Sequence, residues 1–176
     1  MIELKNIIGF ILVSLFMSFS AQVLAQKSFP VHPETGKVFY GGNRNVTPYC
    51  KKKIYKRAVA WASEKQTFPP AVFSISKSTK DTLWIKAVTE VPSIKHLHPI
   101  SFDIRIVVGK RSFQFTAQNF YFEDITLSLE AWIEKFEDSD NQRHIKNSEL
   151  ITKGLDSHVF LTIENLKKNI NNQKAE

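Results

Sequence analysis

The sequence of 176 residues contains one cysteine, Cys50, so no disulfide can form within the chain and the fold must hold without one. Glycine is scarce at six residues, phenylalanine is abundant at 14, and no internal repeat is present. This composition excludes a disordered or low-complexity chain and indicates a packed core. The longest apolar run, about 11 residues near the N-terminus, is too short to span roughly 30 Å of bilayer hydrocarbon comfortably.

The sequence also lacks the local motifs of common enzyme sites. It has no Gly-x-Ser-x-Gly nucleophile turn, no His-Glu-x-x-His zinc motif and no glycine-rich phosphate loop. The acidic pair Glu123-Asp124 follows a predicted strand, where a role in a turn or helix start is favoured over acid catalysis. We therefore assign no catalytic residue and expect no cofactor. An enzyme whose site is assembled from residues distant in the sequence is the alternative.

The N-terminus has the pattern of a signal peptide. A short charged start precedes the apolar run, and Val23 and Ala25 supply the residues that signal peptidase requires. We expect residues 1–25 to be removed after Ala25, and the rest of the chain to act in the periplasm or outside the cell. Because Glu3 offsets Lys5, a retained signal anchor is the alternative. No cysteine lies at the cleavage point, which disfavours a lipoprotein.

The chain carries a formal net charge of +7. An excess of positive charge favours an anionic neighbour, such as a membrane surface, an acidic glycan or nucleic acid, or it simply maintains solubility. Export makes nucleic acid the least favoured of these, so we expect no nucleic-acid partner. An envelope protein, a peptide or a glycan is the expected partner.

A helix is predicted over residues 48–65, because Thr47 suits the N-cap and Pro48 the first helical position. Its apolar stripe contains Cys50, Ile54, Ala58, Trp61 and Ala62. Cys50 on this stripe predicts a buried thiol, and a thiol activated by the helix N-terminus is the alternative. The opposite face is basic, with Lys52, Lys53, Lys56 and Arg57. This basic face is either solvated or a weak docking surface for an anionic membrane.

Alternating apolar and polar residues predict an antiparallel sheet. A short first strand is expected over residues 38–44, and four strands joined as hairpins follow over 72–77, 83–91, 100–108 and 113–118. Gly109-Lys110 is predicted to form the two-residue turn of the last hairpin. In that register Ile106 faces Phe113 on the core side of the sheet.

The other side of the predicted sheet carries the candidate binding residues. They form a polar platform with an aromatic edge: Trp84, Lys86, Ser101, Asp103, Arg105, Gln114, Thr116 and Gln118. In the predicted register Arg105 lies beside Gln114. Sugars and peptides are bound on surfaces of this kind. The alternatives are a solvated face, or a contact for the C-terminal helix or for a second copy of the chain.

His96 and His98 are the candidate metal ligands. Residues at i and i+2 share one face of a strand, and two imidazoles could hold zinc or copper. No third ligand is nearby in the sequence, and His32, His144 and His158 could join only through folding. We therefore predict a solvated loop here and no metal.

Helical spacing returns after Asp124, with a helix over residues 129–136 that Ser128 can cap. A polar linker is predicted to follow, and then a last helix from Ser148 to about residue 170, with a kink or late start near Gly154. The chain then divides into the signal peptide 1–25, an α+β domain 29–136, and a linker with the C-terminal helix, 137–176. The expected fold is an antiparallel sheet of about five strands, with one long helix packed across one face and C-terminal helices beside it.

Three segments resemble a known family: Phe29-Pro-Val-His-Pro-Glu-Thr-Gly-Lys-Val-Phe-Tyr40, Ile54-Tyr-Lys-Arg-Ala-Val-Ala-Trp61, and the hairpin from Val107 through Gly109-Lys110 into Phe113. Together with the aromatic strand Asn119-Phe-Tyr-Phe122, they look like an uncharacterised bacterial envelope domain of unknown function with a TATA-binding-protein-like fold. The resemblance covers residues 29–136. It implies a TATA-binding-protein-like sheet and helix, and a signal peptide. His32 stands where that family has Asp.

The resemblance carries over no catalytic residue, because the family's function is unknown, and its likeness to a DNA-binding protein is one of fold alone. We therefore expect a non-enzymatic binding or assembly module of the cell envelope. The two alternatives are the enzyme described above and a peripheral membrane binder that uses the basic helix face.

Overall fold

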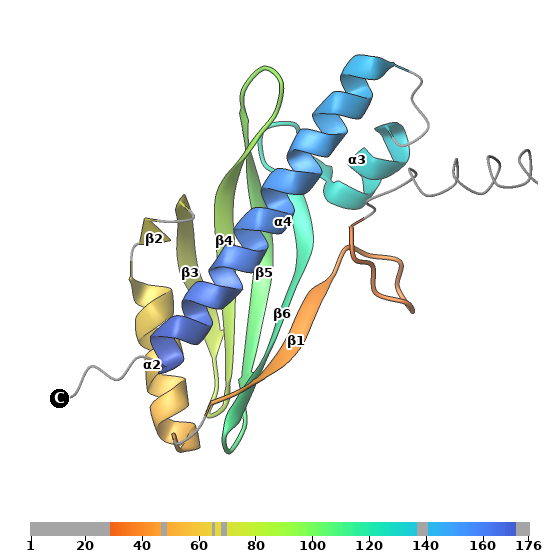
Figure 1. The fold of residues 1–176 in the computed structure, drawn as a ribbon. Helices are drawn as coiled ribbons and strands as arrows, with labels where there is room; N and C mark the ends of the chain where they lie inside the picture. The colour runs from red at the N-terminus through yellow and green to blue at the C-terminus, as the bar shows by residue number, and fades with distance from the viewer. Residues whose placement is uncertain (1–28, 47–48, 65, 68–69, 137–140, 172–176) are drawn as a thin grey trace, which may run out of the picture.

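The computed structural model describes residues 29–46, 49–64, 66–67, 70–136 and 141–171. The predicted signal peptide, residues 1–25, lies outside this part of the chain. One antiparallel sheet with helices on one face accounts for the described elements (Figure 1), and this arrangement confirms the α+β fold class.

The sheet has the strand order β1-β6-β5-β4-β3-β2, with β7 beside β6. The strands are β1 (Tyr40–Asn45), β2 (Gln66–Thr67), β3 (Pro70–Ser78), β4 (Thr82–Pro92), β5 (Leu97–Val108), β6 (Ser112–Phe122) and β7 (Leu127–Ser128). Strands β3 to β6 are consecutive hairpins, as the alternation predicts, and β1 joins the sheet beside β6.

Three helices accompany the sheet: α2 (Lys51–Ser63), α3 (Leu129–Phe136) and α4 (Gln142–Asn171). Helix α4 is the longest element and runs diagonally across the sheet, with α2 beside its C-terminal part (Figure 1). The predicted helix 129–136 is confirmed, and the backbone amide of Ala131 donates to the Ser128 hydroxyl at 3.2 Å, so Ser128 caps it as expected.

The hydrophobic core lies between the helices and one face of the sheet. Along β4, β5 and β6, side chains on that face are buried, and most side chains between them are exposed or half-buried. The largest fully buried side chains come from both layers: Trp61, Phe102, Phe113, Phe120, Phe122, Ile54, Leu83, Ile85, Ile100, Ile106, Leu129 and Ile151. This burial leaves the other face of the central strands to solvent.

The β5–β6 hairpin has a register two residues away from the predicted one. Val108 pairs with Phe113, so Lys110-Arg111 forms the turn, and the predicted Gly109-Lys110 turn is wrong. Gly109 flanks the turn opposite Ser112, where an added Cβ would lie 2.8 Å from the serine Oγ. A shift of two residues keeps every side chain on its predicted face, because the strand repeat is also two.

The aromatic residues of β6 do not alternate strictly along the strand, and a β-bulge accounts for the break. Asn119 has a left-handed backbone with φ 59°, and Phe102 of β5 faces two residues of β6 where the register shifts. The extra residue turns Phe120 onto the core face, where its ring stacks on Phe102 with centroids 5.1 Å apart. The bulge therefore allows phenylalanines on both sides of Asn119 to pack into the same core.

Cys50 is exposed, and the prediction of a buried thiol is wrong. Helix α2 begins at Lys51, so Cys50 is its N-cap and has an extended backbone. A cap residue lies before the first helical turn, and its side chain does not follow the helical stripe. The predicted start at Thr47-Pro48 lies outside the described residues.

Helix α4 begins at Gln142, so the predicted polar linker is wrong for residues 142–147. Asn141 precedes the helix, and its side-chain oxygen accepts from the Arg143 amide at 3.0 Å. The first turns are mostly solvated, which is why their polar sequence resembles a linker. Beyond them the helix is continuous through Gly154. Its apolar stripe is buried on the sheet and α2 through Ile151, Leu155, Val159, Leu166 and Ile170.

Candidate functional site

The face of the sheet that the helices leave uncovered carries the predicted platform. Of the eight predicted residues, only Ser101 is buried, at 4 % exposure. We call the surface the open face and define it by Lys77, Trp84, Lys86, Asp103, Arg105, Gln114, Thr116 and Gln118.

Four strands contribute to one row of side chains across the open face. Thr116 pairs with Arg105, Arg105 with Trp84, and Trp84 with Lys77. This row corrects the predicted pairing of Arg105 with Gln114. Directly opposed residues on antiparallel strands have Cβ atoms roughly 5 Å apart, so the four side chains are consecutive neighbours.

Trp84 lies between two cations near one end of this row. Lys77 Nζ is 5.2 Å from the centroid of the Trp84 ring, and Arg105 Cζ is 5.8 Å from it. The negative face of an aromatic ring attracts both groups. Among the ion pairs of the described residues, none involves Lys77 or Arg105. The ring therefore concentrates positive charge that no carboxylate neutralises through an ion pair.

A second aromatic ring lies at the other end of the row. Gly41 of β1 pairs with Thr116, and a Cβ added to Gly41 would overlap the ring of Phe39. The Phe39 ring therefore lies against Gly41, on the same face as Thr116. Three strand spacings separate Gly41 from Trp84, which is roughly 14 Å. The row thus has an aromatic residue near each end.

A second, more polar row lies beside the first. Gln118 pairs with Asp103, and Asp103 pairs with Lys86. The Asn119 side chain donates to Asp103 Oδ2 at 2.9 Å, and Lys86 Nζ lies 3.7 Å from Glu123 Oε1. These exposed amide, carboxylate and ammonium groups supply both hydrogen-bond donors and acceptors.

Three residues of this surface are not predicted by the sequence pattern: Lys77, Phe39 and Asn119. Lys77 reaches the open face because β3 shifts register between Ile75 and Lys77, which reverses the alternation there. The sequence feature that could have indicated Phe39 is Gly41. A glycine has no side chain, so it leaves room on the open face for the ring of the residue two positions earlier. The signal for Asn119 is the break in the aromatic alternation.

The basic face of α2 is only partly available to a partner. Lys52, Lys53 and Lys56 are exposed. Arg57 Nη1 donates to the Ile170 carbonyl at 2.6 Å, and its guanidinium lies 4.2 Å from the ring centroid of Tyr49. Arg57 therefore ties α2 to the last turn of α4. In the part of the chain that the structure describes, no helix has the length and apolar character needed to cross a membrane.

Three groups with shifted pKa values belong to separate contacts. Burial, with a hydrogen bond to Asp156, raises the pKa of Tyr40 well above its usual range, and this pair ties β1 to α4. Burial lowers the pKa of His158, on the part of α4 that faces β4. The ion pair with Lys51, at 3.0 Å, lowers the pKa of Asp81 at the surface. These groups do not converge on one site.

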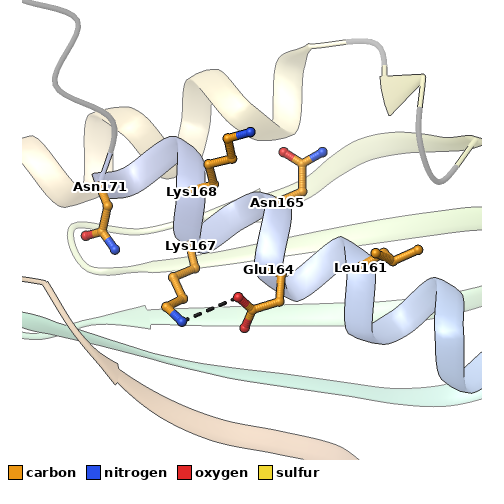
Figure 2. A pocket seen from close by; sticks show the side chains of 6 residues that line it. All are labelled: Leu161, Glu164, Asn165, Lys167, Lys168 and Asn171. Carbon is orange, nitrogen blue, oxygen red and sulfur yellow. Dashed lines mark hydrogen bonds and ion pairs between the residues drawn. The ribbon is translucent and has the colours of Figure 1, made fainter.

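A depression of about 490 Å³ lies on the C-terminal half of α4. Figure 2 shows the side chains that line it, with Lys167 Nζ 3.4 Å from Glu164 Oε2. The lining residues are Leu161, Glu164, Asn165, Lys167, Lys168 and Asn171. Its single carboxylate is paired with a lysine, and none of the three groups with shifted pKa values lines it.

Of the two predicted metal candidates, His96 lies in the loop before β5 and is exposed, whereas His98 lies within β5 and is buried at 7 % exposure. The prediction of a solvated loop is therefore wrong for His98. The structure adds Asp124, whose Oδ2 is 2.7 Å from His98 Nδ1 and 3.5 Å from His96 Nε2. Asp124 is 26 residues away from His98 in the sequence, so only the β5–β6 pairing brings it to this position.

Two solved structures have the same fold as this chain. A TBP-like protein from Parabacteroides distasonis ATCC 8503 superimposes with a TM-score of 0.62 and 18 % identity, over 83 % of this chain and 99 % of that one. A DUF4468 family protein from Bacteroides ovatus ATCC 8483 superimposes with a TM-score of 0.55 and 14 % identity, over 83 % of this chain and 93 % of that one. No protein-family model and no curated protein matches the chain. The two structures confirm the predicted TATA-binding-protein-like fold.

Proposed function

We propose that this chain is an exported, non-enzymatic binding module of the cell envelope, and that its open face binds an acidic oligosaccharide. The observation that carries the proposal is the Trp84 ring between Lys77 and Arg105. Two cations held at one ring repel each other, and an anionic group placed between them relieves that repulsion. The chain's net charge of +7 adds a long-range attraction for an anion.

The shape and chemistry of the open face favour a saccharide. Its first row is roughly 14 Å long between Gly41 and Trp84, which suits an extended oligomer better than a single small molecule. Gln114, Thr116 and Gln118 present amides and a hydroxyl that can pair with sugar hydroxyls. The Phe39 and Trp84 rings supply apolar surfaces on which the C–H groups of sugar rings can pack.

The positions of the groups with shifted pKa values also support binding over catalysis. An active site is expected to gather groups with shifted pKa values in one cleft. In the described part of the chain, the three such groups each serve a separate contact between elements. The open face instead presents exposed polar side chains from four paired strands.

The binding test uses titration calorimetry with an oligogalacturonate as the acidic probe and a neutral malto-oligosaccharide of the same length. We expect only the acidic probe to bind, and Arg105→Ala and Lys77→Ala each to weaken binding by about tenfold. Raising the ionic strength should weaken binding as well, because the charges are exposed and screened.

Two variants serve as matched controls for this test. Arg143→Ala removes an exposed arginine of α4, and Phe160→Ala removes an exposed aromatic ring of the same helix, both outside the open face. Neither should change the affinity. Equal affinity for the acidic and the neutral oligosaccharide, or an Arg105→Ala variant that binds like the wild type, would contradict the proposal.

The export part of the proposal rests on the charged start, the short apolar run and the small residues before Gln26. Its test is N-terminal sequencing of the protein recovered from separated cell fractions. We expect a chain that begins at Gln26 in the periplasmic or extracellular fraction. A full-length chain in the cytoplasmic fraction would exclude export, independently of the outcome for the glycan.

A further inference from the structure

Three metal-ligating side chains meet at the end of the sheet. His96 and His98 lie at the turn before β5 and in its first residues, and Asp124 lies just after β6. The pairing of Ile100 with Phe122 places these two segments side by side. His98 pairs with Val91 and is buried on the core side, so this cluster is separate from the open face.

The ligand atoms of the three residues converge. Asp124 Oδ2 is 2.7 Å from His98 Nδ1 and 3.5 Å from His96 Nε2, and all three ligand atoms lie within 4.8 Å of one another. Around a tetrahedral zinc ion with bonds of about 2.1 Å, ligand atoms are about 3.4 Å apart. To reach that value, the His98–Asp124 separation must lengthen by about 0.7 Å and the His96–His98 separation must shorten by about 1.4 Å at most.

The backbone at this end of the sheet is held by hydrogen bonds. The amide and the hydroxyl of Ser93 both donate to the His96 carbonyl, at 2.9 and 2.7 Å, and the His96 amide donates to Ser93 Oγ at 3.2 Å. The Glu123 amide donates to the Pro99 carbonyl at 2.9 Å, which fixes the residue before Asp124 beside β5. The ligands therefore project from two positioned segments, as a preorganised site requires.

The surroundings fix one side of the cluster and leave the other open. The His98 ring packs edge-on against Phe122, with centroids 5.4 Å apart, and its side chain is 9 % exposed. The His96 side chain is 54 % exposed. An ion held between them would have protein on one side and solvent on the other.

We propose that His96, His98 and Asp124 bind a Zn²⁺ ion. Two imidazoles and one carboxylate form the kind of three-ligand set that holds zinc with a fourth position open to water or to an oxygen ligand. Neutral imidazole and carboxylate also suit other divalent transition ions, which compete in the usual affinity order. The site is not part of the proposed glycan-binding surface and does not depend on it.

The test uses tag-free protein with Cys50→Ser, because the exposed thiol of Cys50 would bind the ion itself. Calorimetric titration with Zn²⁺ should give one ion per chain, and Co²⁺ should produce the visible absorption of a four-coordinate site. His96→Ala and Asp124→Asn should each weaken Zn²⁺ binding by more than about 100-fold, more than the loss of an outer-shell partner costs. His32→Ala removes a histidine outside the cluster and should leave the affinity unchanged.

His96 is exposed, so its replacement leaves the core intact, and circular dichroism of each variant checks the fold. The proposal is overturned if the wild-type cluster binds no Zn²⁺ at micromolar concentration. It is also overturned if His96→Ala and Asp124→Asn bind as the parent does. In either case the cluster is a histidine–carboxylate contact and not a metal site.

Discussion

Gly154 lets helix α4 approach the end of strand β4. A Cβ at this position would lie 2.8 Å from Val91 Cγ1 and 2.9 Å from Pro92 Cδ. Val91 is buried and β-branched, and the proline ring is rigid, so neither neighbour can turn away easily. The predicted site of a kink is therefore a point of close packing.

Replacing this glycine tests the close approach. An alanine gains about 1 kcal/mol of helix propensity, but overpacking costs about 1–3 kcal/mol. We expect Gly154→Ala to lower the free energy of unfolding by about 1 kcal/mol net, measured by urea denaturation. Ser157→Ala, at an exposed position of the same helix, should change it by less than about 0.5 kcal/mol. A more stable Gly154→Ala protein would show that the contact is loose.

His158 makes the stability depend on pH. Its Nδ1 lies 2.7 Å from Thr89 Oγ1, and burial lowers the pKa of the imidazole below its usual 6.5. As the pH falls through 6.5, the unfolded chain therefore binds the proton before the folded chain does, and the folded state loses stability.

We expect the wild type to lose more stability than His158→Gln between pH 7.5 and pH 5.5. Urea denaturation at the two pH values measures the difference. His32→Gln, at a half-exposed histidine near the start of the described chain, should lose as much as the wild type. An equal loss in His158→Gln and the wild type would mean that other groups cause the pH dependence.

At the scale of the elements, Arg57 joins helices α2 and α4, which both pack on the same face of the sheet. Its guanidinium donates to the Ile170 carbonyl, near the C-terminus of α4, and packs on Tyr49. The C-terminal carbonyls of a helix carry partial negative charge and lack intrahelical partners, so a cation there is stabilising.

Arg57→Ala should therefore lower the free energy of unfolding by about 1.5–3 kcal/mol, the value of a hydrogen bond from a charged group. Lys56→Ala removes the adjacent, exposed cation and should change it by less than about 0.5 kcal/mol. Thermal and urea denaturation both measure the effect. If the two variants are equally stable, the basic side chains of α2 act as one solvated face.

The elements that were predicted correctly are those with a long, regular pattern. The hairpins from β3 to β6 follow from alternation, and helix α3 follows from its apolar spacing and Ser128. The turn was predicted wrongly because the alternation of apolar and polar residues does not distinguish between the two possible registers. A shift of two residues preserves the faces, so the pattern could not separate the Gly109-Lys110 turn from the observed one.

The candidate site was predicted as a set of residues but not as an arrangement. The open-face positions on β4, β5 and β6 follow from the two-residue alternation of side chains along a strand alone. Lys77 and Asn119 lie at bulges, where that period fails. Asp124 joins His96 and His98 only through strand pairing, and spacing in the sequence gives no indication of it.

At the scale of the whole molecule, α4 completes the core. Its five buried apolar side chains contribute roughly 1.5–3 kcal/mol each, so their total is comparable to the whole stability of a typical domain. The domain boundary predicted after residue 136 would leave the sheet without this cover.

We expect a chain of residues 29–136 alone to lack a fixed tertiary structure. It should give weak near-ultraviolet circular dichroism, bind a hydrophobic dye and unfold without a cooperative transition. The same measurements on residues 29–176 provide the control. A cooperative transition in the shorter chain would establish 29–136 as an independent domain.

The three tryptophans are divided between two environments. Trp61 and Trp132 are buried in the core at 1 % and 4 % exposure, whereas Trp84 lies half-buried on the open face between two cations. A soluble quencher should therefore reach Trp84 first, and the fluorescence of the other two should persist until unfolding. The molecule carries separate optical reporters for its ligand surface and for its core, with no added label.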